Sequence, residues 1–162
     1  MSGKTQLAFQ AAVMVASRGG EVAYIDTEGT FRPERIAKMA ASRALEAEAV
    51  LSRIFCRRAA SVEEQMESVS RMNEDRRLKG CKMVVVDTVG KNFALEYGGE
   101  ERMMERQSRL SVYLNRIARD AFINDRAVLL TSRVASIGPG AISKEVDLGG
   151  STLRRFVTIS CD

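Results

Sequence analysis

The sequence predicts an α/β fold in which a mostly parallel central sheet is flanked by helices. Helical periodicity alternates along the chain with short apolar, β-branched runs, and two of these runs end in a carboxylate. One of them, residues 82–87, contains four consecutive apolar residues, as expected for a strand covered on both faces. With 162 residues, of which 45% are hydrophobic, the chain is predicted to form a single globular domain over residues 1–162.

The first part of the chain predicts two helices and two strands. In order, they are a helix over 6–18, a strand over 22–26, a helix over 33 to about 48 and a weaker strand over 53–57. Gly19-Gly20 provides the stop signal of the first helix. Pro33 occupies the first position of the second helix, where its missing N–H costs nothing.

The remainder continues the alternation. In order, we expect a helix over 61–79, a strand over 82–87, a helix over 100–122, a strand over 126–132, a loop over 135–150 and a last strand over 153–160. Ser61 and Glu64 have the spacing of a capping box, and Gly80 ends that helix. The long helix carries an apolar stripe that predicts core: Leu110, Tyr113, Leu114, Ile117, Ala118 and Ala121.

Composition argues against several kinds of site. The three cysteines show no C-x-x-C spacing and the chain has no histidine, which disfavours structural zinc, histidine base catalysis and a disulfide framework. We therefore expect a reducing, intracellular compartment.

No segment has the roughly 18 apolar residues of a membrane span, so no membrane partner is expected. The net charge of +4 permits a polyanionic partner without requiring one.

The chain begins with the second half of the phosphate-binding pattern G-x-x-x-x-G-K-[ST]. Lys4 is expected to reach phosphate oxygens and Thr5 to bind Mg²⁺, while the cradle is completed by Ser2, Gly3 and Gln6. The first glycine of the pattern and the strand that should precede it are missing. We therefore expect a core that lacks its first strand and is incomplete at the N-terminus.

Two carboxylates follow buried strands and complete the parts of a nucleotide hydrolase. Asp87 is expected to hold Mg²⁺ together with Thr5, directly or through water, and Glu28 to orient the attacking water. An alternative for Asp87 is a purely structural role, in which it caps a turn with Thr88. The upstream Gly3-Lys4-Thr5 favours the metal.

Residues 24–36, which read YIDTEGTFRPERI, resemble the signature stretch of the RadA-type recombinases of archaea and eukaryotes, in the RecA superfamily. Further resemblances run in order: residues 83–87 to the Walker B strand, 93–97 with Glu101 to the first DNA loop, 106–107 with Leu110 to the helix after it, and 149–153 to the segment closing the second DNA loop. The resemblance implies a RecA-like P-loop ATPase core that uses ATP and Mg²⁺.

The resemblance also assigns roles to two residues. Glu28 matches the catalytic glutamate that activates water, beside Lys4, whose neutralisation of phosphate oxygens is expected from the phosphate-loop pattern itself. Arg35 matches an arginine that stacks on the adenine, a role suited to a planar guanidinium, although an arginine early in a helix is otherwise usually solvated.

The chain departs from the family at the strand leading into the second DNA loop. The family usually carries Thr-Asn-Gln-Val there, and its glutamine senses the γ-phosphate; here the residues are Thr131-Ser132-Arg133-Val134. Three interpretations of Arg133 remain open: contact with the nucleotide phosphate, contact with DNA phosphate, or an ordinary loop arginine.

The first DNA loop departs as well. Ala94 and Glu100 stand where the family commonly has arginines, which predicts weaker DNA binding with a flatter salt dependence. The helix offers a row of cations at Arg102, Arg106 and Arg109. A solvated face, with Glu105 pairing to Arg109, is the other interpretation.

The substitutions favour a divergent paralogue. We expect an ATP-dependent recombinase-type ATPase that acts in homologous recombination and repair, binds single- and double-stranded DNA, and assembles as a homo-oligomeric filament or with related subunits. The location would be the nucleus in a eukaryote and the cytoplasm or nucleoid in an archaeon. The alternatives are a non-catalytic paralogue that mediates assembly, and a fragment that folds poorly and does neither.

Overall fold

A four-stranded, fully parallel sheet forms the centre of the molecule. The computed structural model describes residues 3–137, 144–147, 152–153, 155–156 and 158. The strands of the main sheet lie in the order β2-β1-β3-β4. Their bounds are β1 (Glu21–Asp26), β2 (Ile54–Arg58), β3 (Cys81–Asp87) and β4 (Ala127–Leu130). Both the α/β class and the parallel sheet predicted from the sequence are confirmed.

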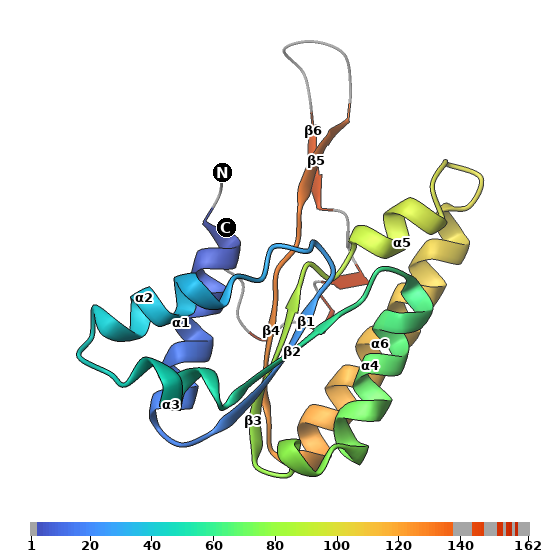
Figure 1. Ribbon diagram of the computed structural model, residues 1–162. Coiled ribbons are helices and arrows are strands. Elements are labelled where there is room, and N and C mark those ends of the chain that lie inside the picture. Colours follow the sequence, from blue (N-terminus) through green and yellow to red (C-terminus); the bar gives the residue numbers. More distant parts are fainter. Residues whose placement is uncertain (1–2, 138–143, 148–151, 154, 157, 159–162) are drawn as a thin grey trace.

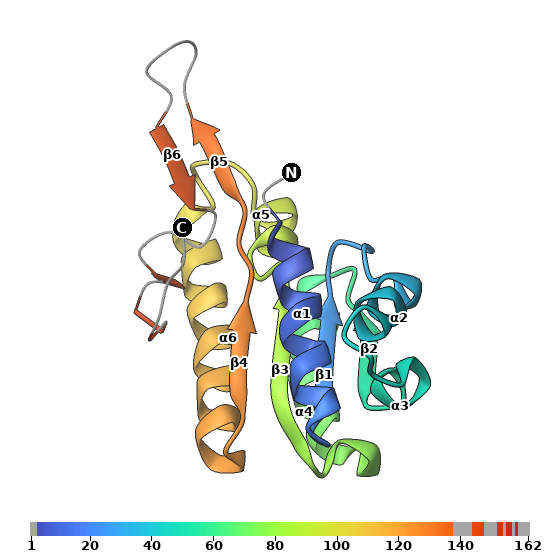
Figure 2. The same ribbon diagram turned by 90° about the vertical axis from the view of Figure 1, so that its left-hand side faces the viewer.

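Helices cover both faces of this sheet (Figures 1 and 2). One face carries α1 (Lys4–Ser17), α2 (Pro33–Ala41) and α3 (Ala47–Leu51). The other carries α4 (Val62–Glu74), α5 (Lys91–Glu96) and α6 (Met103–Asn124), with the short 3-10 helix η1 (Arg76–Leu78). Three layers result, with the sheet in the middle.

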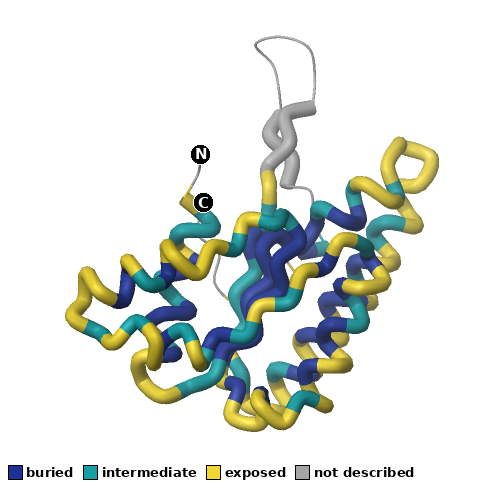
Figure 3. Tube along the Cα trace, in the orientation of Figure 1, coloured by how far each residue is buried: buried dark blue, intermediate teal, exposed yellow. Residues whose placement is uncertain are grey.

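The central strands supply alternate side chains to two separate cores. Ala23 and Ile25 of β1 pack with α4 and α6, whereas Val22 and Tyr24 pack with α1 and α2. Residues of β3 divide in the same way, because successive side chains of a strand point to opposite faces. Figure 3 shows these strands buried at the centre. Cover on both faces explains the continuous apolar run of β3.

The predicted helix over 33–48 is wrong, because two helices separated by a turn occupy this segment. The turn is a Schellman motif: Leu45 N–H donates to Ala40 O and Ala44 N–H donates to Ala41 O, both at 3.0 Å. Ala44 adopts the left-handed conformation with φ 54°. Glycine usually marks this position, so the sequence lacked the expected stop signal.

The predicted helix over 61–79 begins as expected and ends early. Ser61 Oγ accepts from Glu64 N–H at 3.1 Å, and the Glu64 carboxylate accepts from Ala60 N–H at 2.7 Å. At Asp75 the backbone becomes extended (ψ 114°), and the Asp75 carboxylate accepts from Arg77 N–H at 2.9 Å, which starts η1. The acidic residue thus ends one helix and caps the next.

The predictions for the C-terminal part are the least accurate. Within the expected loop over 135–150, β5 (Val134–Ile137) pairs with β6 (Lys144–Asp147) as an antiparallel hairpin. Where a last strand was predicted over 153–160, the described residues Thr152 and Leu153 are helical and residues 155–156 form a turn. The short helix α5 was not predicted, and β4 ends two residues before the predicted end at 132.

Within the described residues, none of the helices has the length and apolar character required to cross a membrane.

Candidate nucleotide-binding site

The candidate site lies at the carboxyl end of the parallel sheet. Strands β1 and β3 both end in an aspartate, and their register places Asp26 beside Asp87. The N-terminus of α1 lies at the same end of the sheet, as does the β5–β6 hairpin (Figure 1). Ligands of open α/β sheets bind at this edge.

Asp26 orders the loop that carries Glu28. Its Oδ1 accepts from the backbone N–H groups of Glu28 (3.0 Å), Gly29 (2.8 Å) and Thr30 (3.3 Å), and its Oδ2 accepts from that of Phe31 (3.1 Å). Sequence reasoning treated Asp26 only as the end of a strand. The signal was present, because an aspartate before a Thr-Glu-Gly-Thr stretch is typical of a turn closed by its own side chain.

Gly29, within this loop, packs closely against the Arg58 side chain of β2. Gly29 has φ 75°, a conformation in which side chains are disfavoured, and a Cβ there would lie 2.5 Å from Arg58 Nη1. Arg58 in turn lies 3.7 Å from the Asp26 carboxylate. The glycine therefore allows the loop to approach the arginine of the neighbouring strand.

A second set of contacts connects this loop to the end of β3. Thr27 Oγ1 donates to Thr88 O and accepts from Thr88 N–H, both at 2.8 Å. Lys91 Nζ donates to Thr27 O at 2.8 Å. The Asp87–Thr88 peptide bond is cis. These contacts place Glu28 beside Thr88, whose hydroxyl donates to Glu28 Oε1 at 2.9 Å.

Asp87 is 1% exposed, and its hydrogen-bond donors among the described residues are neutral. Tyr24 Oη donates to Oδ2 at 2.9 Å and Thr131 Oγ1 donates to Oδ1 at 2.5 Å. Burial and the negative charge of Asp87 raise the pKa of Tyr24 well above its ordinary value, so the phenol remains a neutral donor. No lysine or arginine among the described residues forms an ion pair with Asp87.

These surroundings fit a magnesium ion. A buried carboxylate without a cationic partner is costly, and a divalent cation would offset this cost. Mg²⁺ commonly binds one or two protein oxygens and completes its shell with phosphate and water. The described residues contain no group of three His, Cys, Asp or Glu side chains that could hold a metal. Asp87 and the Thr5 hydroxyl suit the sparser arrangement.

The start of α1 supplies the expected phosphate-binding residues. Gly3 precedes the helix with φ 70°, and Lys4 and Thr5 lie in its first turn. Gly3, as the N-cap residue, has no side chain that could cap the helix, and no acidic residue lies in the first turn, an arrangement that favours an anion at the N–H groups. Ser2 lies outside the described residues.

Gln6 and Arg35 are brought together beside Phe9. Arg35 Nη2 donates to Gln6 Oε1 at 2.8 Å, and its guanidinium lies 5.9 Å from the Phe9 ring centroid. The Phe9 ring also contacts Tyr24 and Phe31. An aromatic cluster thus supports the two polar residues that we expect to bind the nucleotide.

Comparison with known proteins identifies the family. A model of the Rad51 family matches residues 1–152. The chain belongs to the Rad51 family. It is 39% identical over 145 residues to the meiotic recombination protein DMC1 of Saccharomyces cerevisiae and 40% identical over 140 residues to the DNA repair and recombination protein RadA of Metallosphaera sedula. These alignments cover 86% and 82% of the chain but 43% of each relative, so the chain spans less than half of their length. The predicted resemblance to recombinases is confirmed.

In this Rad51-family chain, two of the three arginines expected to form a cationic row make internal contacts. Arg102 donates to Glu96 O at 2.8 Å and lies 4.7 Å from the Tyr97 ring centroid, and Arg106 donates to Tyr97 O at 3.2 Å. The predicted Glu105–Arg109 pair is wrong, because Glu105 pairs with Arg102 at 3.1 Å. Arg109 is exposed.

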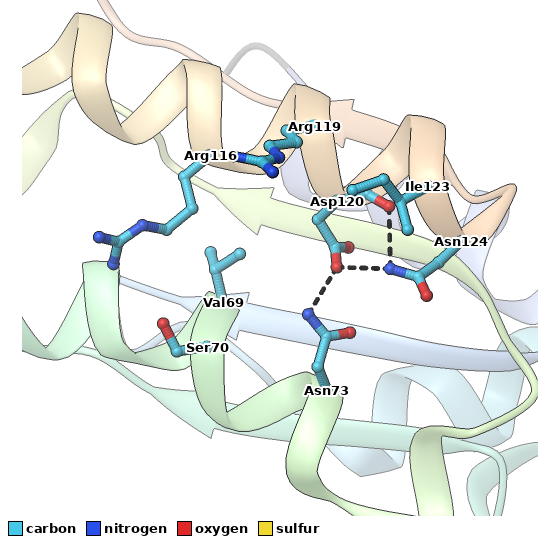
Figure 4. A pocket seen from close by; sticks show the side chains of 8 residues that line it. All are labelled: Val69, Ser70, Asn73, Arg116, Arg119, Asp120, Ile123 and Asn124. Atoms are coloured by element: carbon cyan, nitrogen blue, oxygen red, sulfur yellow. Dashed lines mark hydrogen bonds between the residues drawn. The ribbon is translucent and has the colours of Figure 1, made fainter.

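A separate hollow lies between α4 and α6 (Figure 4). Asp120 accepts there from Asn73 at 2.7 Å and Asn124 at 2.9 Å, and it forms a buried ion pair with Arg126 at 3.0 Å. Arg126 immediately precedes β4, so this network lies at the amino end of the sheet. It connects helices to the sheet at the end opposite the candidate nucleotide site of the Rad51-family chain.

Proposed function

We propose that this chain is the ATPase core of a recombinase that binds ATP with Mg²⁺ and hydrolyses it while assembled on single-stranded DNA. The observation that carries the proposal is the position of Glu28, which the Asp26 contacts hold at the carboxyl end of the sheet. Asp87 lies at the end of the neighbouring strand. A water-orienting carboxylate and a metal-binding carboxylate are needed side by side for phosphoryl transfer to water.

Each residue has a distinct part in this proposal. Lys4 and the N–H groups at the start of α1 bind phosphate oxygens, while Thr5 and Asp87 hold the metal. When bound, Mg²⁺ neutralises charge on the phosphates. Glu28 orients the attacking water and accepts its proton. Gln6 completes the phosphate cradle, and Arg35, which donates to Gln6 beside Phe9, stacks on the base of the nucleotide.

The partners proposed are single- and double-stranded DNA, and further copies of the chain or related recombinase subunits. The names of the two relatives, a meiotic recombination protein and a DNA repair and recombination protein, support this choice. The net charge of +4 is compatible with a DNA partner. A DNA-associated location, in the nucleus of a eukaryote or the cytoplasm or nucleoid of an archaeon, accompanies the proposal.

A second candidate is a non-catalytic paralogue that binds nucleotide and mediates recombinase assembly. The contacts of Arg102 and Arg106 favour it, because arginines bound to backbone carbonyls are less available to DNA phosphates. The departures from the family at Ala94 and Glu100 point in the same direction.

Steady-state ATP hydrolysis separates the two candidates. The chain, a longer version with residues added before Met1 to complete the phosphate loop, and Glu28→Gln versions of both are measured with and without single-stranded DNA. Turnover that DNA increases and Glu28→Gln abolishes supports the ATPase. Nucleotide binding without DNA-stimulated turnover in either version would exclude the ATPase and leave the mediator.

A further inference from the structure

Glu28 and Arg133 form an ion pair at the carboxyl end of the sheet. Arg133 Nη2 donates to Glu28 Oε2 at 2.5 Å, while Thr88 Oγ1 donates to the other oxygen, Oε1, at 2.9 Å. Both carboxylate oxygens are therefore engaged by protein donors. Each carboxylate oxygen has two lone pairs, so a water that Glu28 is to orient must share Oε2 with Arg133 or Oε1 with Thr88. On Oε2 the guanidinium neutralises the negative charge that would otherwise attract the proton of the water.

Of the two donors to Glu28, Arg133 is the one that can move away from the carboxylate. Its side chain is 58% exposed, whereas that of Glu28 is 8% exposed. Thr88 is buried, and its backbone is held by the two hydrogen bonds with Thr27. Arg133 is already largely in solvent, whereas movement of Thr88 would disrupt the loop that positions Glu28.

The segment that carries Arg133 contacts both functional carboxylates. It connects β4, which ends at Leu130, to the β5–β6 hairpin, which begins at Val134. Within this segment Thr131 donates to Asp87, two residues before Arg133 reaches Glu28. A shift of the hairpin base thus changes the surroundings of both carboxylates together.

We propose that Arg133 is a positioning residue that restrains Glu28, so that water activation requires the ion pair to open. The inference rests on the proposed role of Glu28 in hydrolysis. In the restrained state the carboxylate faces the guanidinium, and the chain binds nucleotide with little turnover. Departure of Arg133 leaves Oε2 and its negative charge entirely to the water. Arg133→Gln would remove the positive charge that holds the pair together, whereas Arg133→Lys would keep that charge.

Turnover tests the restraint. Arg133→Gln, Arg133→Lys and Glu28→Gln are compared with the unchanged sequence, with Mg·ATP and without DNA, in the chain and in the longer version described above. Arg133→Gln is expected to raise kcat about tenfold with KM changed less than twofold, because the restraint acts on the chemical step. Arg133→Lys is expected to stay near the original rate. Arg119→Gln, which removes an exposed cation from α6, controls for net charge.

Thermal unfolding without nucleotide gives an independent readout. Arg133→Gln is expected to lower Tm by about 2–4 °C, because it leaves a nearly buried carboxylate without its cation, and to have no such effect in the Glu28→Gln background. Equal effects in both backgrounds would show that the pair does not form in solution and would overturn the proposal.

Different results would overturn the ATPase and the restraint of Glu28 by Arg133. If Glu28→Gln abolishes hydrolysis while Arg133→Gln leaves kcat unchanged or lower, the ATPase stands and the restraint is wrong. If neither version of the protein hydrolyses ATP with any of these substitutions, the ATPase itself is wrong, and the restraint falls with it.

Discussion

Asp26 and Asp87 are partners in the register of β1 and β3, yet their carboxylates have opposite surroundings. Asp26 accepts from four backbone N–H groups and lies near Arg58. Among the described residues, Asp87 accepts only from the hydroxyls of Tyr24 and Thr131. The first arrangement satisfies the charge within the fold, whereas the second agrees with the cation that we propose for Asp87. The two aspartates therefore have different roles despite their equivalent positions.

Asp26→Asn is expected to destabilise the fold by about 2–3 kcal/mol, because an amide loses one acceptor oxygen and turns N–H groups toward backbone donors. Urea unfolding measures this effect. Asp125→Asn is the matched control, since the Asp125 side chain is 99% exposed and lies 3.6 Å from Lys82. Equal stability of the two variants would contradict the role assigned to Asp26.

Asp87→Asn is expected to behave in the opposite way. Its donors are neutral hydroxyls that can rotate, and a buried charge is removed, so the Tm of the nucleotide-free protein should stay unchanged or rise. Mg²⁺-dependent nucleotide affinity should fall at least about tenfold, because the metal loses its carboxylate. Calorimetric titration with Mg·ADP measures the affinity. A large loss of Tm would show that Asp87 is a structural residue.

Sequence reasoning named Glu28 and Asp87 for the candidate site but did not identify the residues that contact them. Buried strands that end in an acid are visible in the sequence, and parallel strands bring such ends to one edge. The hydroxyl of Tyr24 and that of Thr131 follow no comparable pattern, because 63 and 44 residues separate them from Asp87. The Glu28–Arg133 pair spans 105 residues. Contacts at such separations depend on strand order, which periodicity does not specify.

The sequence also predicted the fold only in part, where the signals are local. Strands with continuous apolar runs and the capped start of α4 were placed correctly, since these signals are local. The break after α2 was missed because Ala44 adopts the conformation that glycine usually marks. The β5–β6 hairpin was missed because residues 135–150 were predicted to form a loop without strands.

The network around Asp120 should contribute strongly to stability. Asp120 and Arg126 have side chains that are 6% and 5% exposed. Asp120→Ala leaves the arginine buried without its partner and is expected to cost about 3–5 kcal/mol in the free energy of unfolding. Arg119→Ala changes the neighbouring, exposed position on α6 and should cost less than about 0.5 kcal/mol. Chemical denaturation of both variants gives the comparison, and similar costs would refute the prediction.

Asp75 should make stability depend on pH in the acid range. Its hydrogen bonds with the Arg77 side chain lower the pKa of Asp75 from 3.8 to about 2. Because the pKa is lower in the folded state, the contribution is fully present above the unfolded pKa and disappears as the pH falls through about 4 toward 2. The Tm difference between the original sequence and Asp75→Asn should therefore shrink over this range. A difference that stays constant down to pH 2 would contradict the role of the Arg77 contact.

Gly29→Ala should separate backbone strain from collision in the loop that carries Glu28. Gly29 and Gly19 both have positive φ, at 75° and 87°, so alanine is expected to cost about 1 kcal/mol of strain at either position. At Gly19 a Cβ meets nothing within 4 Å, whereas at Gly29 it lies 2.5 Å from Arg58 Nη1. Gly29→Ala must therefore displace the arginine or the loop as well.

We expect Gly29→Ala to lose more stability than Gly19→Ala. Of the two variants, only Gly29→Ala is expected to lower kcat, by about tenfold or more, because a shift of the loop moves Glu28 with it. Urea unfolding and single-turnover ATP hydrolysis measure the two effects. Equal kcat values for the two alanine variants would mean that the Arg58 contact does not position Glu28.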